Sequence, residues 1–220
     1  MLFTEERLFK LKKLVASRQF DLTVVLENVH DPHNLGAILR TCEAVGVFTI
    51  HVVYSEEGKN SSAKYIGKKA SRGARRWVDV VFHTSMTDCL NELKTRGFQI
   101  LATHLSEEAS SIYETDLSSK CAIVFGNEKD GISEETLRMA DGNILIPIYG
   151  MVQSLNVSVA CAISLFEASR QRQIKGMYDK PFDINNEHMK SCILHYVSDQ
   201  HPRILAANPS VLDDFIQSLS

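Results

Sequence analysis

The chain has 220 residues, of which 44% are hydrophobic and 23% are charged. At this length and hydrophobic content we expect one well-packed α/β domain with short terminal elements, rather than two full domains. No stretch approaches the roughly 20 uninterrupted apolar residues that a membrane-spanning helix needs, and no signal-type apolar run opens the sequence. These features exclude a membrane-spanning protein and predict a cytoplasmic one.

The formal net charge is only −3, so the total does not indicate a nucleic-acid partner. The distribution of charge is more informative. Residues 1–76 contain 13 Lys and Arg against 8 Asp and Glu, and residues 64–76 contain six basic residues and no acid. Such a basic segment can contact an RNA phosphate backbone, or it can be a solvated loop without a partner.

The predicted elements alternate along the chain. Residues 5–15 have acids in the first turn and apolar positions at helical spacing, which indicates a cationic amphipathic helix. Strands are predicted at 22–26, 48–53, 77–82, 98–103, 121–125 and 143–147, and helices near 35–46, 61–73, 86–96, 133–139 and 155–171. This order predicts an α/β fold with a mainly parallel sheet and helices on both faces.

A polar turn joins the strand at 22–26 to the helix that follows it. Pro32 breaks the chain before that helix, which contains Arg40. The turn opens at the carboxyl edge of the sheet, where open α/β proteins bind ligands. Arg40 could engage a phosphate or a developing oxyanion there, or it could be a surface arginine on an amphipathic helix.

Two later strands also run into polar segments. The strand at 121–125 leads into Gly126-Asn127-Glu128. The strand ending at Pro147 leads into a segment containing Ser154, Leu155 and Asn156, followed by an Ala-rich helix. Three strand-to-helix edges therefore carry polar clusters.

These three blocks, in this order, resemble the motifs of the SpoU branch of the SPOUT methyltransferases. The matching elements are N-x-G-x-x-x-R from Asn34 to Arg40, G-N-E from Gly126 to Glu128, and I-P-x-x-G-x-x-x-S-L-N-V-S from Ile146 to Ser158. The resemblance covers roughly residues 5 to 178. It implies a deep C-terminal trefoil knot, S-adenosyl-L-methionine as methyl donor, and a homodimer whose active site is completed across the subunit interface.

The resemblance also implies the function. It points to S-adenosylmethionine-dependent 2′-O-methylation of a guanosine ribose in tRNA, at position 18 of the D-loop. It assigns catalytic roles to Arg40, Asn34, Glu128, Ser154 and Asn156, and places Thr103, Gly126, Ile146 and Leu155 around the methyl donor. We predict RNA contacts at Arg7, Arg18, Lys68, Lys69 and Arg72.

Several of these residues also have a structural interpretation. A protonated guanidinium has no acceptor lone pair, so proton acceptance by Arg40 would need a specially arranged neutral form. Three roles stay open for Arg40: a base, an oxyanion stabiliser or a phosphate anchor. Asn34 could be a turn or N-cap residue, Ser154 could cap the helix that follows, and Glu128 could be an acid near a helix start. His30, His33 and His104 are expected to have hydrogen-bonding or structural roles. A bulky residue at Gly126 could block the pocket.

No metal is expected, because the five cysteines are widely spaced and lie mostly inside apolar runs, as core residues do. The predicted organisation is an N-terminal helical arm (1–18), a methyltransferase domain (19–176) and a C-terminal helical extension (177–220). In that extension, apolar residues from Met189 to Val197 and from Leu212 to Leu219 have helical spacing.

Three other functions were considered. Methylation of ribosomal RNA shares all three motifs, but only about 20 residues precede the first strand, which modestly favours tRNA. A non-catalytic RNA-binding knot protein would not need the intact polar residues. A nicotinamide-nucleotide enzyme lacks support because no G-x-G-x-x-G turn follows the first strand.

Overall fold

The computed structural model describes residues 3–55, 73–106, 108–127, 129–200, 210–217 and 219. The chain divides into two compact units, residues 20–175 on the one hand and the two chain ends, up to Gln19 and from Gly176, on the other. The predicted helix near 61–73, most of the basic segment and the Glu128 side chain lie outside the described residues. Of the basic segment, residues 73–76 are described, and Ala74–Arg76 form the short 3-10 helix η1.

The larger unit is built on a seven-stranded sheet with the order β3-β2-β1-β6-β4-β7-β5. The strands are β1 (Leu22–Glu27), β2 (Thr49–Val53), β3 (Asp79–His83), β4 (Gln99–Thr103), β5 (Ser110–Ser111), β6 (Cys121–Phe125) and β7 (Gly142–Leu145). Every pair of neighbouring strands is parallel. The prediction of a mainly parallel sheet is confirmed. Strand β5 was missed, because two residues are too short to give a periodic pattern.

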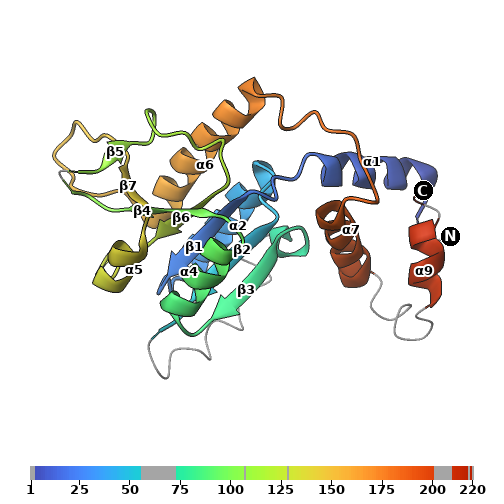
Figure 1. Ribbon diagram of the computed structural model, residues 1–220, viewed down its shortest axis with the longest axis horizontal. Coiled ribbons are helices and arrows are strands. Elements are labelled where there is room, and N and C mark those ends of the chain that lie inside the picture. Colours follow the sequence, from blue (N-terminus) through green and yellow to red (C-terminus); the bar gives the residue numbers. More distant parts are fainter. Residues whose placement is uncertain are drawn as a thin grey trace. The chain divides into compact units, whose positions relative to one another are not determined.

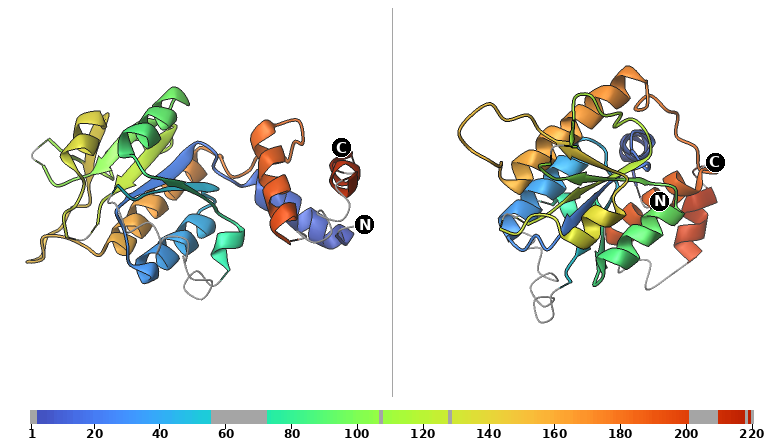
Figure 2. Two further views of the ribbon diagram at one scale, coloured as in Figure 1. Left: turned by 90° about the horizontal axis from the view of Figure 1, so that it is seen from below. Right: turned by 60° about the vertical axis from the view of Figure 1, so that its left-hand side comes forward.

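Helices cover both faces of this sheet (Figures 1 and 2). They are α2 (Pro32–Ala44), α4 (Met86–Thr95), α5 (Glu134–Met139) and α6 (Val157–Ile174). Side chains that alternate along a strand point to opposite faces. Val24 and Leu26 pack in a core with α2 and α6, whereas Val25 packs in a second core with α4 and α5. The prediction of helices on both faces is confirmed.

The strand order brings the polar blocks together. Leu26 at the end of β1 pairs with Phe125 at the end of β6, and β4 lies between β6 and β7. These four strands are parallel and adjacent. The segments that follow β1, β6, β4 and β7 therefore all leave the sheet at the carboxyl ends of the strands. From β1 the chain passes to β2 and β3 on one side, and it later returns to the other side of β1, where β6, β4 and β7 lie. Such a switch point is where a ligand crevice forms in an open α/β sheet.

A buried arginine ties helix α6 to the sheet at the amino ends of the strands. The Arg172 side chain is inaccessible to solvent and forms an ion pair with the Asp21 carboxylate. Its guanidinium also donates to the carbonyl oxygens of Leu117 (3.1 Å) and Ser119 (2.8 Å). A buried charge needs this degree of pairing, because a charge left unpaired in the interior is strongly destabilising. Arg172 therefore fixes the C-terminal end of α6, whose first turn borders the candidate site.

The chain ends form the smaller unit, with α1 (Glu5–Ala16), α7 (Glu187–Gln200) and α9 (Ser210–Gln217). The helices predicted at 5–15 and from Met189 are confirmed. Cys192, Ile193, Tyr196 and Val197 are fully buried. The ring centroids of Phe3 and Phe215 lie 5.6 Å apart in an edge-to-face arrangement. Among the described helices of both units, none has the length and apolar character to cross a bilayer.

Candidate active site

A cavity of about 510 Å³ lies at the carboxyl edge of the sheet, and six of the predicted site residues line it. They are Thr103, Gly126, Ile146, Ser154, Leu155 and Asn156. These residues come from the ends of β4, β6 and β7 and from the segment before α6, so the sheet order explains why they meet. The volume lies within the roughly 300–1,000 Å³ typical of small-molecule sites.

The cavity walls combine apolar side chains with a few polar groups. Ile112, Phe125 and Ile144 supply apolar surface, and Asn127 and Asp130 supply polar atoms. The Thr103 hydroxyl donates to the Val124 carbonyl oxygen at 2.8 Å, so this side chain is used within the sheet. Apolar walls that can hold a flat ring system, together with accessible main chain and a few polar groups, suit a nucleoside such as the adenosyl part of S-adenosylmethionine.

Gly126 has no space for a side chain. A Cβ built on it would lie 2.0 Å from the Gly131 carbonyl oxygen and 2.5 Å from the Ile132 nitrogen. The loop that folds back on Gly126 is tied by Asn127, whose Oδ1 accepts from the main-chain nitrogens of Lys129 (2.9 Å) and Asp130 (2.7 Å). The sequence predicted that a bulky residue here would block the pocket. The structure gives a stricter reason, since even a methyl group would collide with the backbone.

Two asparagines from distant motifs contact each other at the cavity. The Asn156 side-chain amide donates to Asn34 Oδ1 at 3.1 Å, and Asn34 is 8% exposed. The Asn156 Oδ1 accepts from the Ser158 nitrogen at 2.9 Å, so Asn156 is the N-cap of α6. The alternative that Ser154 caps this helix is therefore wrong: α6 begins at Val157, and Ser154 is exposed at the cavity.

This asparagine pair gives a prediction about coupling. In a double-mutant cycle of Asn34→Ala and Asn156→Ala, we expect a coupling free energy of about 1 kcal/mol in chemical unfolding, because the two amides share one partly buried hydrogen bond. Purely additive effects on the free energy of unfolding would contradict a direct interaction. A matched cycle of Asn34→Ala with Thr103→Val, whose hydroxyl bonds elsewhere, should be additive within about 0.5 kcal/mol.

Arg40 is exposed on α2 and is not among the residues that line the cavity. It follows Asn34 by six positions, which at 3.6 residues per turn places the two side chains about 120° apart around the helix. Within the described part of the chain, Arg40 makes no ion pair or hydrogen bond. Among the described residues its guanidinium therefore has no partner, and the structure does not bring Arg40 to the cavity.

The predicted RNA-binding residues have different outcomes. Arg7 is exposed on α1, with its guanidinium 5.4 Å from the centre of the Phe3 ring. Arg18 is 2% exposed and its Nε donates to the Tyr196 hydroxyl at 2.7 Å. The prediction of an RNA contact at Arg18 is wrong in this structure, because a buried guanidinium that holds α7 cannot reach a phosphate. Lys68, Lys69 and Arg72 lie outside the described residues.

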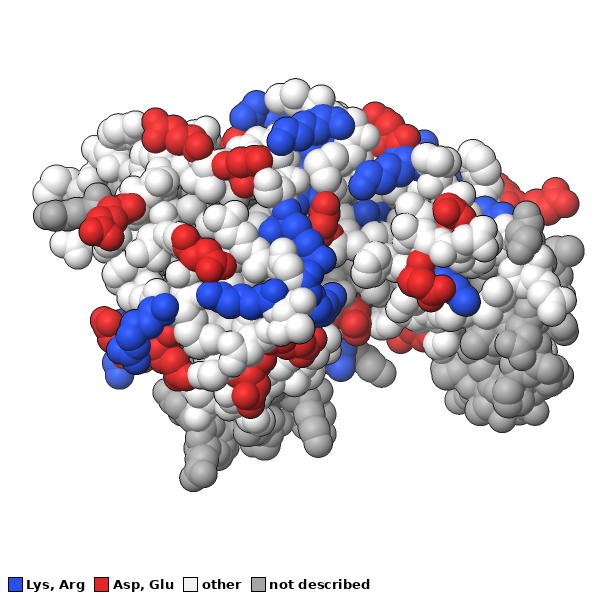
Figure 3. Space-filling model, viewed as in Figure 1, with Lys and Arg blue, Asp and Glu red and all other residues white. Residues whose placement is uncertain are grey.

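Charge on the described surface is mixed. On the face in Figure 3, Lys and Arg side chains are interspersed with Asp and Glu. Arg75 and Arg76 at the end of the basic segment are exposed. Mixed charge on this face does not indicate a path for RNA.

Several residues at the cavity were not assigned from the sequence. Lys129, Asp130 and Gln153 line it and lie within the recognised blocks, so their position next to matched residues was a usable signal. Ile112 also lines the cavity, but it follows the two-residue strand β5, and no sequence pattern indicated it. His104 also lines the cavity, whereas His30 stacks on Tyr54 with ring centroids 5.0 Å apart. The His30 contact agrees with the structural role expected for it.

A parallel α/β sheet with a nucleoside-sized cavity at its switch point defines a protein that binds a nucleotide-like ligand at the carboxyl edge of its strands. Residues 21–166 match the SpoU rRNA Methylase family, and the chain belongs to that family. This membership confirms the resemblance seen in the three motifs.

Individual relatives are similar over most of the chain. A tRNA (guanosine(18)-2′-O)-methyltransferase from Thermus thermophilus is 49% identical over 178 residues, which cover 81% of this chain and 89% of the relative. The solved structure of the A. aeolicus TrmH/SpoU tRNA modifying enzyme matches with a TM-score of 0.79 and 40% identity, over 90% of this chain and 98% of the other. An AdoMet-bound rRNA methyltransferase from Sinorhizobium meliloti matches with a TM-score of 0.61 and 30% identity, over 72% of this chain and 59% of the other.

Proposed function

We propose that this protein transfers a methyl group from S-adenosylmethionine to the 2′-hydroxyl of a tRNA guanosine, at position 18 of the D-loop. The observation that carries this proposal is the convergence of six predicted site residues on one cavity. The identity of 49% to a tRNA (guanosine(18)-2′-O)-methyltransferase, over 89% of that protein, supports the acceptor. Action on a ribose 2′-hydroxyl also explains a choice of RNA over DNA.

The residues present suit this chemistry. S-adenosylmethionine, when bound, supplies an electrophilic methyl group on a sulfonium centre. The protein must hold the ribose oxygen in line with that methyl group and compensate the loss of the hydroxyl proton. A guanidinium donates hydrogen bonds in a fixed fork, so Arg40 can stabilise negative charge that develops on the ribose oxygen and can also hold an adjacent phosphate. Asn34 and Asn156 position the segments on either side of the cavity, and Ser154 and Glu128 remain proposed contacts to the ribose.

The position of Arg40 supports a homodimer with a shared active site. Arg40 is exposed and does not line its own subunit's cavity. The same unit exposes large apolar side chains before and along α6: Tyr149, Met151, Val152, Val159 and Phe166. Exposed apolar surface of this extent marks an interaction site. A two-fold dimer can cover it and bring Arg40 to the partner's cavity. A C-terminal trefoil knot in the same region remains part of the proposal, as the resemblance to the SPOUT methyltransferases implies.

Replacement of Phe166 by glutamate is expected to shift the protein from dimer to monomer in analytical ultracentrifugation, because Phe166 is 58% exposed and a charge in an apolar interface is costly. Methyl transfer should fall at least ten-fold at the same protein concentration. Phe9→Glu is the control for sedimentation, since Phe9 is also an exposed helical phenylalanine, 70% exposed on α1. A Phe166→Glu protein that sediments as the wild type would contradict this placement of the interface.

Two other functions remain as alternatives. Ribosomal RNA is the acceptor of the AdoMet-bound S. meliloti relative, which is 30% identical. A non-catalytic RNA-binding protein would retain the fold without turnover. We propose that residues 19–176 carry the chemistry in the cytoplasm, and that the ends (1–18 and 177–220) assist RNA binding through exposed residues such as Arg7. The basic residues Lys68, Lys69 and Arg72 remain proposed RNA contacts.

The test is incubation of the purified full chain with methyl-labelled S-adenosylmethionine and either unmodified tRNA or protein-free ribosomal RNA. Label on tRNA alone supports the proposal. Label on ribosomal RNA alone would contradict the proposed tRNA acceptor and support methylation of ribosomal RNA. No label on either, with RNA binding retained in a filter assay, would favour the non-catalytic protein.

A further inference from the structure

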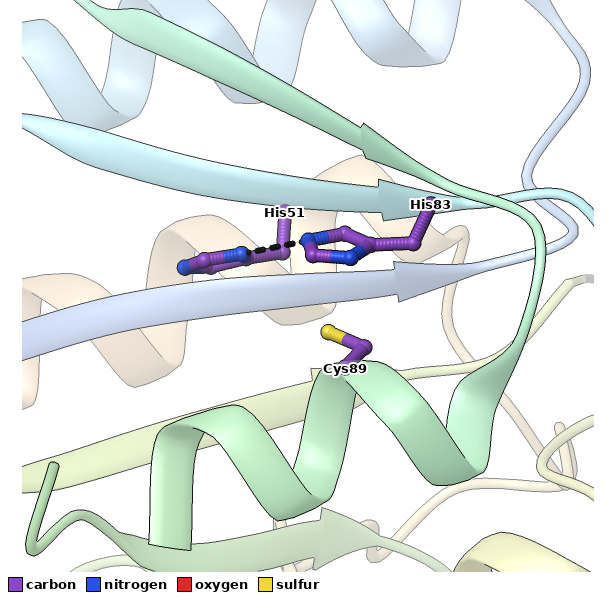
Figure 4. A group of neighbouring side chains, drawn as sticks. All are labelled: His51, His83 and Cys89. Atoms are coloured by element: carbon purple, nitrogen blue, oxygen red, sulfur yellow. Dashed lines mark hydrogen bonds between the residues drawn. The ribbon is translucent and has the colours of Figure 1, made fainter. Parts of the chain in front are cut away.

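Three metal-ligating side chains meet on the sheet face that α4 covers, outside the candidate active site. They are His51 on β2, His83 at the end of β3, and Cys89 on α4. His51 pairs in register with Val81, two residues before His83, so the two imidazoles project from the same face. Figure 4 shows the Cys89 sulfur pointing toward these rings from the helix.

The distances within this cluster are short. His51 Nδ1 lies 2.9 Å from His83 Nε2, and the three potential ligand atoms all lie within 4.8 Å of one another. With metal–nitrogen and metal–sulfur bonds of about 2.0 and 2.3 Å, the donors of a tetrahedral zinc site are about 3.3 to 3.6 Å apart. Shifts of about 1 Å in side-chain positions would therefore convert the hydrogen-bonded histidine pair into a three-ligand site.

We propose that His51, His83 and Cys89 form a binding site for a soft divalent cation of the Zn²⁺ type. One thiolate and two imidazoles favour such ions over Mg²⁺ or Ca²⁺, which prefer oxygen ligands. Three protein ligands leave a fourth position for water, and His83 is partly exposed at the rim of the sheet. None of the three residues lines the active-site cavity, so the site is independent of methyl transfer.

The buried environment acts in opposite directions on the two kinds of ligand, favouring the neutral imidazole and disfavouring the thiolate. Burial, together with the nearby His83 and Arg96, lowers the pKa of His51 to about 3, so its imidazole is neutral and keeps a lone pair. Burial, together with Glu92, raises the pKa of Cys89 to about 12. Binding must therefore release the thiol proton to solvent as the metal–sulfur bond forms. The two charged neighbours, Arg96 and Glu92, are paired with each other at 3.4 Å.

A metal bound at this site would have a structural role, because its ligands come from two strands and a helix. Strand β3 is at the edge of the sheet, and a metal at this position would fix it to β2 and to α4. The sequence-based expectation was that all five cysteines are buried core residues and that no metal binds. The cysteines are indeed all buried and free of disulfides. The spacing of 32 and 6 residues between the three proposed ligands matches no common zinc motif, which explains why no sequence pattern indicated the site.

The site can be tested by titrating the metal-free full chain with Co²⁺ and with Zn²⁺. We expect one Co²⁺ per chain, with visible tetrahedral absorption and a near-ultraviolet sulfur-to-cobalt band, and displacement of Co²⁺ by Zn²⁺. Zn²⁺ should also raise the melting temperature. Cys89→Ala and His83→Ala should each bind Co²⁺ at least ten-fold more weakly, and Cys89→Ala should lose the sulfur band.

Cys121→Ala is the matched control, because Cys121 is also a fully buried cysteine of the same unit but lies on β6 and packs in the opposite core. It should bind Co²⁺ as the wild type does. Circular dichroism establishes that each variant folds. The proposal is overturned if the wild type shows no sulfur-to-cobalt band, or if wild type and Cys89→Ala bind Co²⁺ with equal affinity.

Discussion

An Arg40→Ala variant is expected to transfer methyl groups about a thousand times more slowly than the wild type, while its affinity for S-adenosylmethionine changes less than about three-fold. The physical reason is that, in the proposed mechanism, Arg40 donates hydrogen bonds to the acceptor side of the reaction. It does not line the cavity in its own chain, and its side chain is exposed. Loss of the guanidinium should therefore affect the chemical step and leave the cofactor-binding walls intact. Single-turnover methylation and calorimetric titration measure the two quantities separately.

Arg138→Ala is the matched control for Arg40→Ala, since Arg138 is also an exposed arginine on a helix of the same unit. It should retain the wild-type rate. Arg40→Lys should recover only part of the activity, because a lysine keeps the charge but lacks the planar fork. If Arg40→Ala instead lost S-adenosylmethionine affinity in proportion to activity, Arg40 would be a cofactor-binding residue and the account of its role would be wrong.

Gly126→Ala is expected to weaken S-adenosylmethionine binding at least a hundred-fold. The added Cβ would lie 2.0 Å from the Gly131 oxygen, and both partners in this clash are main chain, so the loop has to open. Asn127 holds that loop through two main-chain hydrogen bonds, which would be strained or lost. Overpacking of this kind costs about 1 to 3 kcal/mol of stability. Because Gly126 itself lines the cavity, the shape of the binding site changes as well.

A matched glycine is available for this experiment. A Cβ on Gly142, in β7, would meet only Leu101 Cδ2 at 3.5 Å, which is an ordinary contact. Gly142→Ala should therefore bind S-adenosylmethionine within about two-fold of the wild type. Equal affinities of Gly126→Ala and Gly142→Ala in calorimetric titration would show that the loop at Gly126 adapts freely, contrary to this account.

The residues that line the cavity could be predicted because they match positions of the SpoU family, most of them in compact blocks beside strong strand signals. Each block directly follows a short apolar strand, and parallel strands deliver their following segments to one edge. The order β1-β6-β4-β7, which makes these segments neighbours, was not predictable from periodicity. The contact between Asn34 and Asn156 joins residues 122 positions apart, so it also required the structure.

The errors have identifiable physical causes. Arg18 looked like part of a basic helical arm, but tertiary packing against Tyr196 buries it, and charge in the sequence does not reveal such a partner. The predicted start of α6 at residue 155 was two residues early, because Asn156 rather than Ser154 caps it. The proximity of His51, His83 and Cys89 was not predicted either, because the cluster combines two strands and a helix and no local pattern brings such residues together.

We expect this chain to methylate the ribose of one guanosine in the tRNA D-loop. Mass-spectrometric mapping of an unmodified tRNA transcript, after reaction with the purified protein and S-adenosylmethionine, tests it most directly. The account predicts a single 2′-O-methyl group, on guanosine 18, that is absent after reaction with Arg40→Ala. A methyl group on a base, or on a ribose outside the D-loop, would contradict it.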